Sequence, residues 1–255
     1  MRPTQLASRA LRAFRRLGPK GFFGLLITNL RLVASGRYRE HSHAYDRAFD
    51  QRHGVDTAGT VNLEEMDVPE ELRGRAVRYE AVDPDFFAHV LGRASIGDRS
   101  RYLFIDLGSG KGRALLLAAQ SGFRRVVGVE LDPHLDAAAR RNIGVFRWEH
   151  RQTEFEQVNG DATAYPFPAT PTVLFLNNPF DELLIGKVLD NVESVHRGSA
   201  TDFVLLYLHS NHERMMRLRP GWSEVDSGTF RSRRKFYAIF RWEPRSDGQG
   251  ATAGR

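Results

Sequence analysis

From residue 101 onward, short apolar runs alternate with polar and glycine-containing segments. Five of these runs predict β-strands, at residues 102–105, 126–129, 155–158, 172–176 and 203–208. Apolar positions at helical spacing predict helices between them, at residues 113–120, from Pro133 onward, and from Asp181 to about Val195. This alternation indicates a parallel sheet with helices on both faces, which is a doubly wound α/β fold.

The end of the pattern is different. Residues 223–230 and 235–241 are two predicted strands with no helix between them, so they indicate a hairpin that adds antiparallel strands to a mostly parallel sheet. A helix is also predicted at Asp85–Leu91, directly after Pro84. We therefore expect one α/β domain at residues 85–244, followed by a polar, disordered tail at residues 245–255.

Residues 1–40 form a separate basic, helical segment. At 100° per residue, Leu6, Leu11 and Phe14 fall on one side of a helix and the arginines between them on the other. The apolar stretch at residues 21–33 is too short to cross a bilayer, and no signal-peptide cleavage site is recognisable. The pattern is typical of peripheral contact with a membrane surface through residues 1–33. The alternative is that both helices cover an apolar face of the same protein.

Residues 41–84 are polar and acidic, and they predict a loop-rich lead-in or lid beside the domain. The charge of the chain follows this division, because residues 1–40 hold nine Arg or Lys and one acid. Subtracting them from the totals of 37 basic and 31 acidic residues leaves 28 and 30, so the net charge of +6 belongs to the N-terminus. A nearly neutral body gives no reason to expect a nucleic-acid partner.

The chain contains no cysteine, which excludes disulfides, thiolate metal ligands and a cysteine nucleophile. We expect a cytoplasmic protein, peripheral at the inner membrane surface if the N-terminal helices bind there. His209 and His212 are three residues apart but have no cysteine or carboxylate in a ligand pattern nearby, so no metal site is predicted.

The strongest chemical signal is the loop Asp106–Gly112 (DLGSGKG), which joins a predicted strand to a predicted helix. Open α/β sheets bind ligands at this edge, and glycine lets the main chain approach a ligand closely. A phosphate-binding P-loop requires Ser or Thr after Gly-Lys, where this chain has Gly112. A dinucleotide loop has another glycine spacing, and the carboxylate of Asp106 would repel a pyrophosphate. A cationic ligand without phosphates fits better.

Acidic residues also follow the next two strands. Glu130 is placed to accept hydrogen bonds from both hydroxyls of a ribose, and Asp161, with Ala162 beside it, from an adenine amino group. Together with the glycine loop, the segments VVGVELDP, NGDA and FLNNPF resemble successive motifs of class I methyltransferases over residues 102–180. The resemblance implies a seven-stranded sheet and S-adenosylmethionine as the cofactor. The cofactor-binding residues that it implies are Asp106, Gly108, Ser109, Gly110, Gly112, Glu130, Leu131, Asp161, Ala162 and Asn177.

Asn177-Asn178-Pro179-Phe180 resembles the (Asp/Asn)-Pro-Pro-(Tyr/Phe) loop of enzymes that methylate amino nitrogen, although Asn178 replaces the first proline. This loop and the Tyr79-Glu80 lead-in are also similar to non-SET protein-lysine methyltransferases. The resemblance implies that Tyr79, Asn177, Asn178, Pro179 and Phe180 are catalytic, and that the acceptor is the amino nitrogen of a protein lysine or of another amine. An equally weighted interpretation is that Asn177 contacts only the cofactor, while Pro179 and Phe180 shape the loop.

Two other functions stay open at this stage. The first is an O- or N-methyltransferase for a small molecule or lipid, in which the N-terminal helices reach the substrate at a bilayer surface. The second is a cofactor-binding module without catalytic activity. The presence of acids at all three strand ends argues against the second, because a decayed enzyme has no reason to keep them together.

Overall fold

The computed structural model describes residues 46–70, 77–147, 152–177, 180–197, 199, 201–210 and 212–243, without the side chains of residues 232–234. The chain divides into two compact units, Met1–Ala48 and Phe49–Arg255. Of the first unit, only residues 46–48 are described, and they are helical. The predicted helices in residues 1–40 and the predicted tail therefore lie outside the described residues.

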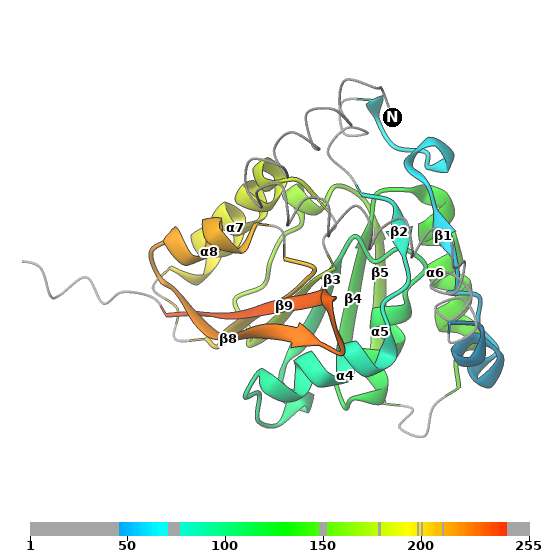
Figure 1. Ribbon diagram of the computed structural model, residues 1–255, viewed down its shortest axis with the longest axis horizontal. Coiled ribbons are helices and arrows are strands. Elements are labelled where there is room, and N and C mark those ends of the chain that lie inside the picture. Colours follow the sequence, from blue (N-terminus) through cyan, green and yellow to red (C-terminus); the bar gives the residue numbers. More distant parts are fainter. Residues whose placement is uncertain are drawn as a thin grey trace, which may run out of the picture. The chain divides into compact units, whose positions relative to one another are not determined.

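The second unit is built on a seven-stranded sheet in the order β5-β4-β3-β6-β7-β9-β8 (Figure 1). Its strands are β3 (Leu103–Leu107), β4 (Arg125–Glu130), β5 (Glu154–Asn159), β6 (Thr172–Asn177), β7 (Phe203–Leu208), β8 (Trp222–Phe230) and β9 (Ser232–Trp242). The first five pair in parallel, whereas β9 pairs antiparallel with both β7 and β8. This confirms the predicted mostly parallel, doubly wound sheet with a C-terminal antiparallel hairpin.

Helices connect these strands: α4 (Pro84–Arg93), α5 (Arg113–Gln120), α6 (Pro133–Val145), α7 (Glu182–His196) and α8 (Glu213–Leu218), with the short 3-10 turns η2 (Arg99–Arg101) and η3 (Ala162–Ala164). An aspartate side chain accepts a main-chain N–H at the start of each of three helices: Asp83 for α4, Asp132 for α6 and Asp181 for α7. Such caps satisfy donors that the first turn leaves without a partner. The local sequence therefore fixes where these helices begin.

The central strand β3 is buried on both faces, as expected for a parallel sheet between two layers of helices. Phe104 packs in a core with residues of α4 and α5. Its neighbours Leu103 and Ile105 point the other way, into a core with residues of α7. Because the alternation places apolar side chains on both faces, the carboxyl edge of the sheet is where polar residues gather.

The lead-in segment, defined here as residues 49–68 and 77–82, precedes α4. It contains two short antiparallel strands, β1 (Thr60–Val61) and β2 (Tyr79–Glu80), with the turn η1 (Leu63–Glu65) between them. Met66 and Val68 pack with Leu135 of α6 in a small apolar cluster. The segment is thus attached to the domain through side chains of its own.

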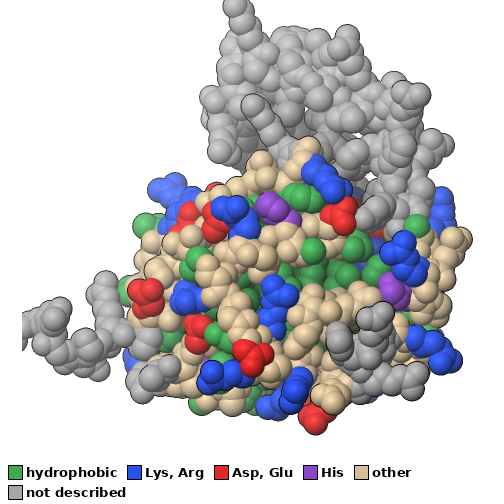
Figure 2. All heavy atoms as spheres, turned by 90° about the horizontal axis from the view of Figure 1, so that it is seen from below, with side chains coloured by type: hydrophobic (Ala, Val, Ile, Leu, Met, Phe, Trp, Pro, Cys, Tyr) green, Lys and Arg blue, Asp and Glu red, His purple; other side chains and the backbone are tan. Residues whose placement is uncertain are grey.

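On the face shown in Figure 2, lysine and arginine side chains lie apart from one another, with acidic and neutral groups between them. This distribution agrees with the near balance of basic and acidic residues after residue 40. Within the part of the chain that the structure describes, no helix combines the length and the apolar character needed to cross a bilayer.

Candidate cofactor and acceptor site

A pocket lies at the carboxyl ends of β3, β4 and β6, where the sequence predicted a ligand site. The glycine loop, the strand ends and the lead-in segment form its walls. The predicted site residues that line it are Tyr79, Asp106, Gly108, Ser109, Gly110, Glu130, Leu131, Asp161, Ala162, Asn177 and Phe180. The structure therefore brings most of the predicted residues together. Asn178 and Pro179 lie outside the described residues.

Gly112, which was also predicted to bind the cofactor, is not among the residues that line the pocket. It is the N-cap of α5 with φ of 85°, a conformation that glycine adopts without strain. A Cβ atom there would lie 3.2 Å from the Cβ of Ala139 in α6. Gly112 thus allows α5 to begin close against α6, and its part in the site is to shape the loop.

Two carboxyl groups are buried in the pocket. Asp106 is 4% exposed and Glu130 is 5% exposed. Burial raises the pKa of Asp106 well above its usual value, and the neighbouring charge of Glu130 adds to this rise. Burial also raises the pKa of Glu130, to about 7, while hydrogen bonds from main-chain N–H groups act in the opposite direction. Both acids would be stabilised in their charged form by a cation in the pocket.

The two acids have different hydrogen-bond partners. Glu130 accepts the main-chain N–H of Gly110 at 2.7 Å with one oxygen and that of Asp132 at 2.9 Å with the other. It therefore holds the glycine loop as well as facing the pocket. No hydrogen bond from the described residues reaches the carboxyl group of Asp106. A buried carboxyl group without a donor suits a ligand that brings an N–H group or a positive charge.

These residues fit S-adenosylmethionine. Its methionine part carries an ammonium and a sulfonium group, which suit the buried carboxyl of Asp106. Leu131 and Ala162 would provide apolar contact for an adenine ring, and Asp161 also lines the pocket. The Asp161 carboxylate also accepts the main-chain N–H of Thr163 at 2.8 Å, which fixes its orientation at the start of η3.

The pocket wall also contains Asn177, at the end of β6. Its Nδ2 donates to the main-chain oxygen of Glu80 at 3.5 Å, a long contact that joins β6 to the lead-in segment. Because a carbonyl oxygen can only accept, this contact determines which end of the amide faces Glu80. The other end, Oδ1, is buried and has no hydrogen-bond partner among the described residues. Phe180 lines the same pocket and packs partly against the core beneath α7.

Sequence reasoning missed part of the pocket wall. Met66, Val68 and Arg113 also line it. Met66 and Val68 lie in a segment whose apolar positions are few, so no periodic signal marked them. Arg113 follows the glycine loop directly and was predicted only as the first residue of a helix. Its side chain is 1% exposed, and burial of an arginine is a sign that charged partners surround it.

Residues 105–197 match a family model described as a methyltransferase domain. The match begins within β3 and ends after α7. No curated protein matches the chain in sequence. Among solved structures, the glycopeptide N-methyltransferase MtfA is 14% identical with a TM-score of 0.50, over 65% of this chain and 92% of that one. The putative methyltransferase yhhF from Escherichia coli is 12% identical with a TM-score of 0.50, over 71% and 92%. These structural likenesses show a shared fold.

Proposed function

We propose that the methyl acceptor of this class I S-adenosylmethionine-dependent methyltransferase is an amino nitrogen, on a protein lysine or on another amine. Asn177 carries this proposal. Its Oδ1 atom is buried and has no hydrogen-bond partner among the described residues. A buried acceptor that makes no hydrogen bond costs about 1–3 kcal/mol of stability. An acceptor N–H group would provide the missing partner.

The rim of the pocket also suits an amine. Glu80 lines the pocket and is exposed, and its carboxylate pairs with Arg78 at 3.1 Å. An exposed carboxylate near the rim would attract an arriving ammonium group from solvent. Phe180 adds an aromatic wall beside Asn177. An amide oxygen, an aromatic ring and a nearby acid together match what an amine acceptor needs.

Bound S-adenosylmethionine supplies an electrophilic methyl carbon on its sulfonium. The bond from the acceptor nitrogen to that carbon forms as the carbon–sulfur bond breaks. The electron pair of the broken bond stays on sulfur, and the amine gives up one proton. The protein residues form no covalent bond in this reaction, so positioning of the nitrogen by Asn177 and Phe180 provides most of their contribution.

The proposal is tested by transfer of label from methyl-tritiated S-adenosylmethionine. The full-length protein is incubated with an extract of cells that lack it, and the products are separated into protein, lipid and small molecules. We expect label in protein bands, on a lysine or other amino nitrogen located by mass spectrometry. Asp106→Ala, which should lose the cofactor, shows the background from other methyltransferases.

Two variants at Asn177 separate acceptor binding from cofactor binding. Asn177→Ala should lower label transfer by about 100-fold, the cost typical of a misplaced reactant, with the affinity for S-adenosylhomocysteine changed only a few-fold. Asn177→Asp keeps an oxygen acceptor and should retain more activity than the alanine variant. Label confined to oxygen atoms, or to lipids without an amine, would overturn the amine proposal and leave the methyltransferase identification unchanged.

A further inference from the structure

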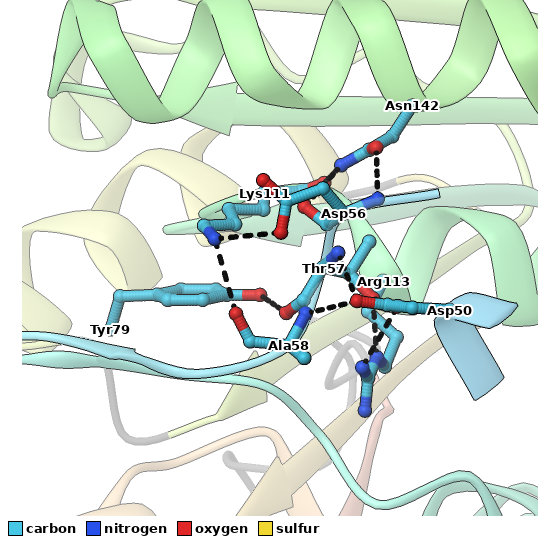
Figure 3. A network of polar contacts seen from close by, with 8 residues as sticks. All are labelled: Asp50, Asp56, Thr57, Ala58, Tyr79, Lys111, Arg113 and Asn142. Atoms are coloured by element: carbon cyan, nitrogen blue, oxygen red, sulfur yellow. Dashed lines mark hydrogen bonds and ion pairs between the residues drawn. The ribbon is translucent and has the colours of Figure 1, made fainter. Parts of the chain in front are cut away.

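A buried polar network joins the lead-in segment to the start of α5, directly after the glycine loop (Figure 3). Arg113 donates from Nε to the hydroxyl of Thr57 at 2.7 Å and from its guanidinium to the carboxylate of Asp50 at 3.2 Å. The hydroxyl of Thr57 in turn donates to Asp50 at 2.6 Å. Asp50 and Thr57 are buried, as is Arg113. Each of the three side chains thus fixes the other two.

The same carboxylate also holds the main chain of the lead-in segment. The second oxygen of Asp50 accepts the N–H groups of Thr57 at 2.8 Å and Ala58 at 2.6 Å. Lys111 of the glycine loop donates to the main-chain oxygen of Ala58 at 3.1 Å. As a result, the carbonyl group of Thr57 has a fixed position relative to the glycine loop.

That carbonyl group accepts the hydroxyl of Tyr79 at 2.6 Å. The ring of Tyr79 lies against Gly110, since a Cβ atom at Gly110 would be 2.2 Å from two of its carbons. Both residues line the cofactor pocket. The ring is therefore held at one end by the glycine loop and at the other by a carbonyl group that Asp50, Thr57 and Arg113 keep in place.

We propose that Asp50 and Thr57 are positioning residues for the cofactor. They hold the carbonyl group that orients Tyr79, and they thereby place the Tyr79 ring as a wall of the cofactor pocket over the glycine loop. The inference rests on the identification of the chain as an S-adenosylmethionine-dependent methyltransferase and is independent of the acceptor.

Variants that remove a whole charge are unsuitable for the test. Asp50 and Arg113 form a buried ion pair, and removal of one partner leaves the other charge buried without compensation, which destabilises the fold strongly. Removal of a hydroxyl group keeps the charges and the shape. Tyr79→Phe removes the donor to Thr57, and Thr57→Val removes the hydroxyl that joins Arg113 to Asp50.

The measurement is the affinity of full-length variants for S-adenosylhomocysteine by calorimetry, alongside their melting temperatures. We expect Tyr79→Phe and Thr57→Val each to bind about 5- to 10-fold more weakly, as loss of one hydrogen bond predicts. Thr57→Ser keeps the hydroxyl and should bind as the parent does. Tyr102→Phe is the matched control, because it removes a tyrosine hydroxyl that donates to Asp202 at 2.5 Å, at the amino edge of the sheet.

Tyr102→Phe should lower the melting temperature without changing the affinity, since it does not touch the pocket. If Tyr79→Phe and Thr57→Val bind the cofactor product as tightly as the parent, the positioning role is wrong. It is also wrong if Tyr102→Phe or Thr57→Ser weakens binding by the same factor, because the effect then follows general stability. No methyl acceptor enters this measurement, so its result stays interpretable even if the amine proposal fails.

Discussion

Replacement of Gly110 by alanine is expected to be costly for two separable reasons. The first is the main chain, since Gly110 has φ of 54°, and an L-residue in this region costs about 1–2 kcal/mol. The second is the ring of Tyr79, which lies where the new methyl group would be, 2.2 Å away. Movement of the ring breaks its hydrogen bond to Thr57, worth about 0.5–1.5 kcal/mol. The expected loss in free energy of unfolding is about 2–3 kcal/mol.

Urea unfolding of four variants separates the two reasons. Gly122→Ala is the control for the main chain alone, because Gly122 has φ of 94° and open space around it, and it should cost about 1–2 kcal/mol. In the parent, Gly110→Ala should lower the free energy of unfolding by more than Gly122→Ala does. In a Tyr79→Ala background, the two glycine substitutions should lower it by about the same amount. If Gly110→Ala costs the same in both backgrounds, the double-mutant cycle shows no coupling and the ring contact is not the cause.

Two further predictions concern pH and the N-terminus. Burial raises the pKa of Glu130 from 4.5 to about 7. Between these pH values the folded protein therefore holds a proton that the unfolded chain has released, and the free energy of unfolding should fall as the pH rises through this range. Affinity for S-adenosylhomocysteine should increase through pH 7, as the carboxylate becomes able to accept the ribose hydroxyls. Calorimetry should find this dependence in the parent and a weaker one in Glu130→Gln, in which Asp106, whose pKa is also raised, still titrates. A flat parent profile would refute the assignment. Deletion of residues 1–33 should abolish sedimentation with phosphatidylserine-containing vesicles and leave cofactor affinity unchanged. Equal sedimentation of both forms would remove the membrane hypothesis.

Much of the sheet was predictable because its signal is local. The predicted bounds of α5 and β7 agree with the structure. Strands β4, β5 and β6 extend one residue beyond their apolar runs at one or both ends, and β9 begins three residues earlier than predicted. The extensions are polar residues such as Glu154 and Asn159, which continue the pairing of β5 with β4 without adding to the apolar pattern. Helix α8 was not predicted, because Glu213–Leu218 is too short to show a helical period.

The candidate site was predictable only in part. Asp106 lies next to the last residue of β3, Glu130 ends β4 and Asp161 follows β5, so chain order alone brought them to one edge. The network of Asp50, Thr57 and Arg113 has no such signal. The hydrogen bonds of Arg113 join it to Thr57 and Asp50, which come 56 and 63 positions before it in the chain. Contacts of this range between polar residues depend on the tertiary fold, which no local pattern encodes.

The domain also holds the lead-in segment by its main chain, in addition to the side-chain contacts. Asn142 of α6 accepts the N–H of Asp56 at 2.8 Å and donates to its carbonyl oxygen at 3.0 Å, as a neighbouring strand would. Asp132 accepts the N–H of Asp67 at 2.6 Å. Hydrogen bonds to main-chain groups depend on the conformation of the segment and not on which side chains its residues carry. The strand-end acids Asp106, Glu130 and Asp161 lie within the matched interval of residues 105–197, whereas Tyr79 and the wall of the pocket that contains it come before that interval. The pocket is therefore complete only with the lead-in segment in place.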